Sequence, residues 1–283
     1  MHDLQYTAIG FVVGALVGMT GVGGGSLTTP LLIVLFGVAP ATAVGTDLLF
    51  AAVTKTAGSL VHGYNHTIDW RLVRRLASGS VPGTMLTLLT LSHLDMASGG
   101  ARMIISVFLT IALLLTAGVL VARPKIVELY SRHVGELSDR AAAIATVCVG
   151  AALGVMVTIS SVGAGALGVT ALVLLYPRLP TVRIVGSDIA HAVPLTLVAG
   201  LGHGIMGSLD LHVLLALLMG SLPGIFVGSL MSTRVPDVAL RYVLAATLIL
   251  VSGKLAVDTR DHYARTITST GSAPTSTGSA SGR

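Results

Sequence analysis

Two glycine-rich stretches decide how this sequence is interpreted: Thr20-Gly-Val-Gly-Gly-Gly25-Ser26 and Ser160-Ser-Val-Gly-Ala-Gly165-Ala166. They lie 140 positions apart, and the glycine pair Gly10 and Gly14 before the first stretch is matched by Gly150 and Gly154 before the second. Self-similarity at a fixed spacing indicates repeated structural units.

Further matches follow in the same order after one inserted residue, at an offset of 141. They are Gly45-Thr46-Asp47 with Gly186-Ser187-Asp188, His62-Gly63 with His203-Gly204, Asp69 with Asp210, and residues 79–83 with 220–224. These matches occur in the same order in both halves, with a single inserted residue between them. The chain therefore consists of two copies of one unit.

The composition excludes an ordinary cytosolic enzyme. Of 283 residues, 53% are hydrophobic and 10% are charged, whereas soluble domains contain about 25% charged residues. Residues 4–46 and 141–177 contain no Asp, Glu, Lys or Arg, and a membrane span takes about 20 apolar residues. The sequence therefore predicts an all-α polytopic membrane protein.

Each copy contains five apolar segments. They are 6–20, 27–36, 48–61, 72–91 and 103–121 in the first copy, and 141–157, 167–176, 189–206, 213–231 and 238–257 in the second. The first two of each copy are short. Ten residues reach about 15 Å as a helix, against a hydrocarbon core of about 30 Å. We therefore expect the glycine loops to lie inside the membrane, in re-entrant hairpins or broken helices.

The basic residues predict that the second copy is inverted. If the segments alternate, eleven basic residues fall on one side of the membrane and Arg102 falls on the other. The eleven are Arg71, Arg74, Arg75, Arg123, Lys125, Arg132, Arg140, Arg178, Arg183, Arg234 and Arg241. Because basic loops stay in the cytoplasm, we predict that this side is cytoplasmic and that both termini lie outside.

Four regions follow from this division. We predict a first transmembrane repeat (1–122), a cytoplasmic linker (123–140), a second, inverted transmembrane repeat (141–257) and a disordered polar tail (258–283), rich in Ser, Thr and Gly.

The two glycine loops are candidate anion cradles. Each precedes a short helix, so free backbone N–H groups and the positive helix end would face the loop, and glycine allows an anion to approach the backbone. The candidate residues are Thr20, Gly21, Gly23, Gly24, Gly25 and Ser26, and Ser160, Ser161, Gly163 and Gly165. The alternative is that these glycines merely allow close helix packing.

Three ionisable residues lie at or inside apolar segments: Asp47, Lys55 and Asp188. Each would cost roughly 2.5–3.5 kcal/mol at the bilayer centre, so they must be paired, hydrated or near an interface. Lys55 lies about 12 Å along a helix from Asp47, too far to pair with it directly. We expect Lys55 to balance the charge of an anion or to pair with an Asp of the other copy. The alternative for both aspartates is helix N-capping.

Three histidines are candidates for coupling or gating. His62 and His203 are equivalent in the two copies, and His191 follows Asp188 by three residues, on the same helix face. Histidine can relay protons near neutral pH. The alternative is a structural histidine bonded to the backbone.

The motifs resemble those of the TauE/SafE family of sulfite and organosulfonate exporters. The resemblance rests on Gly14-x-x-x-Gly18-x-x-Gly21-x-Gly-Gly-Gly25 with Pro30, on Pro40-x-x-Ala43-x-Gly45-Thr46, on Val162-Gly-Ala-Gly165 and on residues 186–194. It implies a bacterial inner-membrane transporter of small, often sulfur-containing anions, with Thr46 and Ser187 added to the binding regions. Family members often carry a small hydroxyl residue where this chain has Asp47.

Three functions remain as hypotheses. The first is a secondary transporter of a small anion such as sulfite or sulfoacetate, with Asp47 or Asp188 as proton carrier. The second is a cation or metal transporter that uses the Asp and His residues, and the third is an intramembrane protease with Asp47 and Asp188 as catalytic pair. We expect no cofactor, no bound metal and no nucleic-acid partner. The expected partners are the anion and the bilayer, with a homodimer as candidate assembly.

Overall fold

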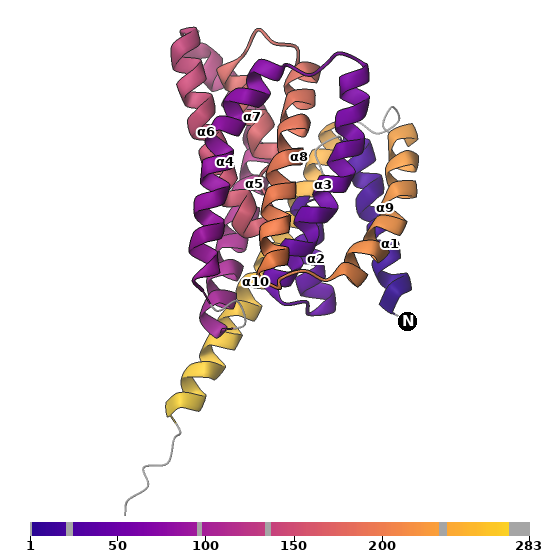
Figure 1. Cartoon of the computed structure of the whole chain (residues 1–283), viewed down its shortest axis with the longest axis vertical. Coiled ribbons are helices and arrows are strands. Elements are labelled where there is room, and N and C mark those ends of the chain that lie inside the picture. Colours follow the sequence, from indigo (N-terminus) through magenta and orange to yellow (C-terminus); the bar gives the residue numbers. More distant parts are fainter. Residues whose placement is uncertain (1, 21–24, 95–97, 134–136, 232–236, 272–283) are drawn as a thin grey trace, which may run out of the picture.

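The computed structural model describes residues 2–20, 25–94, 98–133, 137–231 and 237–271, which form a bundle of long helices (Figure 1). Within these residues there are ten helices and no strand. The helices are α1 (His2–Thr20), α2 (Gly25–Phe36), α3 (Pro40–Tyr64), α4 (Trp70–Ser92), α5 (Gly99–His133), α6 (Asp139–Ser160), α7 (Ala166–Leu175), α8 (Thr181–Ile205), α9 (Leu211–Met231) and α10 (Asp237–Gly271). The predicted all-α architecture is confirmed.

The two halves of the chain contain the same series of helices. α3 and α8 have 25 residues each, and both their first and their last residues differ by the offset of 141 found in the sequence. α4 and α9 begin at Trp70 and Leu211, with the same offset. The short helices α2 and α7 follow the two glycine-rich stretches. The repeat in the sequence therefore corresponds to a repeat of helices.

Equivalent helices make reciprocal contacts between the halves. α1 packs against α9 and α4 packs against α6, while α3 and α8 pack against each other at the centre. Gly10 in α1 meets the Leu217 carbonyl, and its equivalent Gly150 in α6 meets the carbonyl of Leu76, which is the equivalent of Leu217. A Cβ atom on either glycine would collide with that backbone. Small residues thus set the spacing of both helix pairs.

The central helices α3 and α8 run in opposite directions. Gly45 near the start of α3 packs against His203 near the end of α8, and Gly186 near the start of α8 packs against His62 near the end of α3. The two equivalent helices are therefore antiparallel. An inverted second repeat requires this antiparallel arrangement, and the inversion itself stays a prediction.

Two equivalent hydrogen bonds join the loops to these helices. The Thr46 hydroxyl accepts the backbone N–H of Asp210 at 3.0 Å, and the Ser187 hydroxyl accepts the backbone N–H of Asp69 at 2.8 Å. Both aspartates also accept backbone N–H groups of the first turn of the helix that follows them. Thr46 and Ser187 therefore fix the loop of the opposite repeat.

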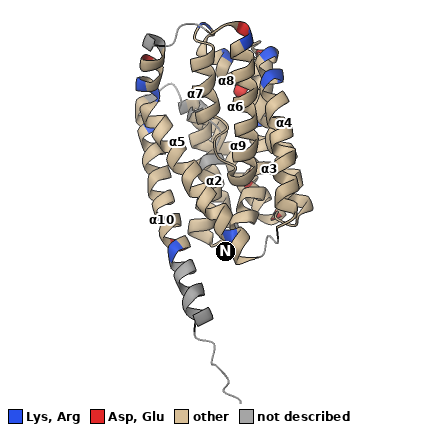
Figure 2. Cartoon of the chain, turned by 90° about the vertical axis from the view of Figure 1, so that its left-hand side faces the viewer, with Lys and Arg blue, Asp and Glu red and all other residues tan. Residues whose placement is uncertain are grey.

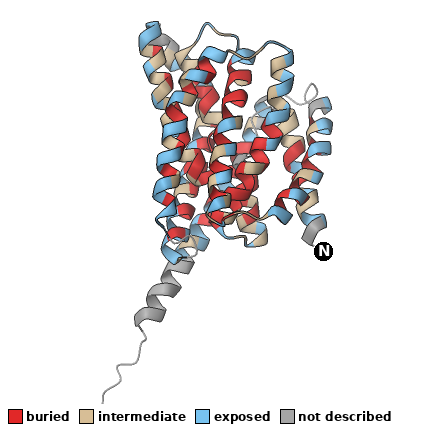
Figure 3. Ribbon diagram, in the orientation of Figure 1, coloured by how far each residue is buried: buried red, intermediate tan, exposed pale blue. Residues whose placement is uncertain are grey.

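Figure 3 shows exposed residues on the outside of the bundle and buried residues inside it. Many of the exposed residues are large hydrophobic ones, and several polar residues are buried. Leu60, Met219 and Leu250 are at least 70% exposed, whereas Asp47 and Asp188 are almost fully buried. This distribution suits a protein surrounded by lipid. In the part of the chain that the structure describes, five helices are long and apolar enough to cross a membrane: α5, α6, α8, α9 and α10. The chain is a polytopic membrane protein.

Basic residues gather at one end of the bundle. Figure 2 shows most Lys and Arg residues at the end far from the N-terminus. There Arg71 and Arg75 form ion pairs with Asp139 at 2.7 and 3.0 Å, and Arg75 also donates to the Tyr176 hydroxyl at 2.9 Å. These contacts join α4 and α6 to the end of α7.

One prediction about segment length was correct and one was wrong for the second copy. α2 and α7 have 12 and 10 residues, which confirms that the second segment of each copy is short. The first segment is short in the first copy, where the apolar part of α1 is Leu4–Met19, but not in the second, where α6 has 22 residues and is long enough to cross a membrane. Both helices extend through polar residues that precede the apolar run, since helical hydrogen bonds do not require apolar side chains.

The predicted linker and tail are also partly helical. α5 continues to His133 and α6 begins at Asp139, so most of the predicted cytoplasmic linker, 123–140, is helical. α10 continues to Gly271, so it includes residues 258–271 of the stretch for which the sequence predicts a disordered tail; that disorder stays a prediction. Residues 272–283 lie outside the described part of the chain.

Candidate functional site

The three ionisable residues noted in the sequence are buried inside the central helices. Asp47 is 0% exposed, Asp188 1% and Lys55 7%. α3 starts at Pro40, and proline suits a first helical turn because it lacks an N–H group. Asp47 and Asp188 each lie seven residues after the start of their helix. The alternative that they cap the helices is therefore wrong.

Asp47 lies against the first half of the short helix α2. The Thr29 hydroxyl donates to its Oδ2 at 2.6 Å, and the side chains of Thr28 and Ser161 also face this carboxyl group. Its Oδ1 has no hydrogen-bond partner of regular geometry among the described residues. Asp47 thus lies where α2, α3 and the end of α6 meet.

Asp188 occupies the equivalent place at the start of the short helix α7. The backbone N–H of Gly165 is directed at its carboxylate, and a Cβ atom on Gly168 would collide with Oδ1. No hydrogen bond of regular geometry reaches either carboxylate oxygen from the described residues. The N-terminal turn of α7, which attracts negative charge, therefore faces a carboxylate of the protein itself.

Lys55 lies near both aspartates. Its Nζ donates to the carbonyl of Ala164 at 3.4 Å, and it is within electrostatic range of Asp188 and Asp47. No ion pair within 4.0 Å joins Lys55 to an aspartate in the described ranges. The expectation that Lys55 pairs with an Asp of the other copy, or balances the charge of an anion, therefore stays a prediction.

The second glycine loop connects these three side chains. Ser161 has a φ of 56°, Gly163 of 113° and Gly165 of 116°. Glycine adopts positive φ values without steric cost, so Gly163 and Gly165 allow the sharp path from α6 to α7. Along this path Ser161 faces Asp47, the Ala164 carbonyl faces Lys55 and the Gly165 amide faces Asp188. The loop therefore forms one wall of a buried polar cluster.

Several other predicted site residues have structural partners. Ser160 donates to the Met156 carbonyl at 2.7 Å within its own helix. Thr46 and Ser187 bind the loops of the opposite repeat, as described above. These three hydroxyls are already engaged in the structure.

The first glycine loop cannot be compared with the second. Gly21, Gly23 and Gly24 lie outside the described residues. Thr20 ends α1, and Gly25 and Ser26 begin α2, but the side chains of Thr20 and Ser26 also lie outside the description. The prediction of an anion cradle in this loop stays a prediction.

The histidines lie at different distances from the cluster. The His191 ring is buried, its Nε2 is 2.8 Å from the Ser80 hydroxyl, and it is within electrostatic range of Lys55. His203 Nε2 is 2.9 Å from the Thr158 carbonyl, whereas His62 Nδ1 is 2.8 Å from the Thr67 hydroxyl. His191 therefore belongs to the cluster, while His62 and His203 support the ends of the central helices.

Sequence reasoning missed Thr28, Thr29 and Gly168, which contact the two aspartates. Thr28 and Thr29 are fully buried, and a pair of hydroxyl residues within the apolar segment 27–36 is the signal that could have identified them. Gly168 gave no signal, because the need for a small residue there depends on the position of Asp188 in another helix.

The polar cluster is incompletely satisfied. Asp47 Oδ1, both oxygens of Asp188, the Ser161 hydroxyl and His191 Nδ1 are buried without a hydrogen-bond partner in the described part of the chain. Each such group costs about 1–3 kcal/mol if it stays unpaired. The cluster is therefore suited to bind water, an ion or a small polar molecule. We define the central cluster as Asp47, Lys55, Asp188, His191 and residues 161–165.

Comparisons with known proteins agree with these observations. The family model described as "Sulfite exporter TauE/SafE" matches residues 6–255. The probable membrane transporter protein YjnA of Bacillus subtilis (strain 168) is 38% identical over 257 residues, which cover 87% of this chain and 96% of the relative. A probable membrane transporter protein of Xylella fastidiosa (strain Temecula1 / ATCC 700964) is 27% identical, over 80% of this chain and 83% of its own length. No solved structure matches the chain.

The match spans both halves of the bundle and all residues of the central cluster. Both relatives carry names of transporters rather than of enzymes, which removes the support for an intramembrane protease. This chain belongs to the TauE/SafE sulfite exporter family and is a membrane transporter.

Proposed function

We propose that this protein is a secondary transporter of a small anion and that the central cluster is its binding site. The family description supports a sulfur-containing oxyanion or an organosulfonate, such as sulfite or sulfoacetate, as substrate. The observation that carries the proposal is a buried ammonium group, Lys55, beside the N-terminal turn of the short helix α7, where Gly165 is also buried. Both features attract negative charge.

In this proposal the Asp188 carboxylate lies where the anionic group of the substrate binds during transport. Its carboxylate faces the Gly165 amide and lies against Gly168, where an incoming oxyanion would find the same donors. Two carboxylates and one ammonium group carry a net charge of −1, so an anion enters at lower electrostatic cost when one carboxylate binds a proton. We therefore propose proton coupling through Asp188 or Asp47, with His191 as a neighbouring proton acceptor.

The fold supports a transport cycle based on two inverted repeats. Transporters of this design bind substrate at the repeat interface, near discontinuous helices, and expose the site alternately to the two sides. The central cluster lies between α3 and α8, beside both short helices. We propose a location in the plasma membrane, the inner membrane in a two-membrane bacterium, with both termini outside. A homodimer also stays a prediction, which light scattering of the purified protein tests.

A cation transporter is the second candidate. The net negative charge of the central cluster and the unpaired oxygens of Asp188 favour it. Lys55 opposes it, because a cation in the cluster would lie near a buried ammonium group. In the described residues no group of three His, Cys, Asp or Glu side chains could hold a metal ion.

Flux measurements in proteoliposomes separate the two candidates. Purified protein is reconstituted and tested for uptake of sulfite, sulfoacetate, sodium and magnesium, with and without a pH gradient, against protein-free liposomes. We expect saturable flux of at least one of the two anions, altered by the pH gradient, and no cation flux above the protein-free control. Saturable cation flux without anion flux would reject the anion proposal.

A further inference from the structure

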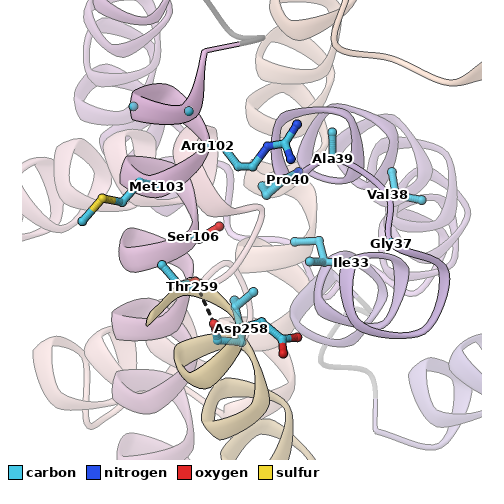
Figure 4. A pocket seen from close by; sticks show the side chains of 13 residues that line it. Ile33, Gly37, Val38, Ala39, Pro40, Arg102, Met103, Ser106, Asp258 and Thr259 are labelled. Atoms are coloured by element: carbon cyan, nitrogen blue, oxygen red, sulfur yellow. Dashed lines mark hydrogen bonds between the residues drawn. The ribbon is translucent and has the colours of Figure 1, made fainter. Parts of the chain in front are cut away.

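A cavity of about 470 Å³, seen from close by in Figure 4, has no residue of the central cluster in its lining. It is lined by the end of α2 and the starts of α3 and α5, together with part of α10. Pro40 at its rim precedes Asp47 by seven residues, or about 10 Å along α3. Its volume is in the range of cavities that hold small ligands, about 300–1,000 Å³.

The cavity contains one residue of each charge. Arg102 enters from α5 and Asp258 from α10, and Figure 4 shows the two side chains apart from each other. No ion pair within 4.0 Å joins them, and neither side chain has a hydrogen-bond partner among the described residues. The cavity thus presents two free, opposite charges at separate positions.

The remaining walls are mainly apolar. Ile33, Met103 and Leu255 lie beside the charged residues. Gly99 and Gly100, at the start of α5, also line the cavity near Arg102, and the start of a helix favours an anionic group. An anion alone would leave Asp258 unpaired nearby, and a cation alone would leave Arg102 unpaired.

We propose that this cavity binds a zwitterion that carries an ammonium group and an anionic group joined by a short chain. The anionic group pairs with Arg102 and the ammonium group with Asp258, while the apolar part lies against Ile33, Met103 and Leu255. Two sources supply such chemistry: the phosphoethanolamine headgroup of a bilayer lipid, and a free molecule such as O-phosphoethanolamine. This site is separate from the transport site and does not depend on the proposed substrate.

Binding experiments on the purified full chain test this proposal. Delipidated protein in detergent is titrated with phosphatidylethanolamine and phosphatidylglycerol, followed by native mass spectrometry. In parallel it is titrated with O-phosphoethanolamine and glycerol phosphate, followed by calorimetry. The variants are Arg102→Gln and Asp258→Asn, with Arg74→Gln, an exposed arginine of α4, as matched control.

We expect wild type and Arg74→Gln to bind at least one zwitterion about tenfold or more tightly than the matching anion. The reason is that only the zwitterion has an ammonium group for Asp258, and one hydrogen bond to a charged group is worth about a factor of ten in affinity. Asp258→Asn should abolish the preference, and Arg102→Gln should weaken zwitterion binding about tenfold. A preference confined to the lipid pair identifies the bilayer as source, and one confined to the soluble pair identifies a free ligand. Equal binding of zwitterion and anion by wild type, or an unchanged preference in both cavity variants, would overturn the proposal.

Discussion

At the scale of single residues, the two equivalent aspartates have similar surroundings but different partners. Each carboxylate faces the first half of a short helix, Asp47 at α2 and Asp188 at α7. Asp47 accepts a hydrogen bond from Thr29, whereas Asp188 accepts none of regular geometry among the described residues. Lys55 has no basic equivalent in the second repeat, where Thr196 stands at its position. The site is therefore asymmetric, and Asp188 is the carboxylate that is freer to change its interactions.

A methyl group at Gly168 should displace the Asp188 carboxylate from its present position. We expect Gly168→Ala to reduce substrate flux about tenfold or more, because an added Cβ collides with Oδ1 and small displacements in a binding site have large effects on rate. Gly118→Ala is the matched control, since a Cβ there meets open space. Equal flux in the two variants would show that this contact is irrelevant to transport.

Removal of the Thr29 hydroxyl should destabilise the fold. Thr29→Val keeps the side-chain shape but deletes the 2.6 Å hydrogen bond to Asp47, and loss of a bond to a buried charged group costs about 1–3 kcal/mol. Thr54→Val is the control, because the Thr54 hydroxyl bonds to a carbonyl of its own helix at 3.0 Å. Thermal unfolding in detergent should show a lower midpoint for Thr29→Val than for Thr54→Val. The reverse order would contradict this role of Thr29.

At the scale of helices, glycines determine how the two halves pack. α1 and α9 run parallel, as do α4 and α6, because residue numbers increase together along both pairs: Gly79 meets Val147 and Gly83 meets Ala151. In membranes such close contacts replace the hydrophobic effect as a source of helix association. The same contacts occur in both repeats, so each should contribute similarly to stability.

A larger side chain at these glycines should separate the helices. We expect Gly150→Val and Gly10→Val to lower the unfolding midpoint, because each Cβ would meet the backbone of the partner helix. Such overpacking lowers the free energy of unfolding by about 1–3 kcal/mol or more. Gly253→Val in α10 provides the control, since a Cβ there has open space around it. Size-exclusion chromatography and thermal unfolding measure the outcome. If Gly150→Val were as stable as Gly253→Val, helix packing would not depend on this contact.

Much of the fold could be predicted from the sequence because it depends on local composition and on the repeat. The ten apolar segments, the short second segment of each copy and the position of Asp47, Lys55 and Asp188 at or inside apolar segments follow from hydropathy and spacing. The contacts within the central cluster could not be predicted. That Ala164 faces Lys55, or that Gly168 faces Asp188, depends on how α3 and α8 cross the short helices. The capping hypothesis failed because both helices begin seven residues earlier, where Pro40 and Thr181 start them.

At the scale of the whole molecule, the charges indicate which end of the bundle faces the cytoplasm. The ion pairs of Arg71 and Arg75 with Asp139 lie at the end where basic residues gather (Figure 2). Arg102 lies in the cavity formed by the end of α2 and the start of α3. Because basic loops remain in the cytoplasm, these two regions should lie on opposite sides of the membrane.

Cysteine accessibility tests this orientation. In a Cys148→Ser background, Arg102→Cys and Arg74→Cys each introduce a single thiol at an exposed position. A membrane-impermeant thiol reagent added to intact cells should label Arg102→Cys and leave Arg74→Cys unlabelled until the membrane is permeabilised. The opposite pattern would reverse the topology, and labelling of both in intact cells would contradict the separation of the two ends.

We propose that the buried cluster around Lys55 binds the transported anion. The most direct measurement compares anion flux in proteoliposomes for wild type, Lys55→Met and the exposed control Lys125→Met, at equal amounts of folded protein. Loss of a buried ammonium group that contacts an anion should lower flux about tenfold or more, while Lys125→Met should resemble wild type. Equal flux of the same anion in all three proteins would contradict the assignment of the transport site.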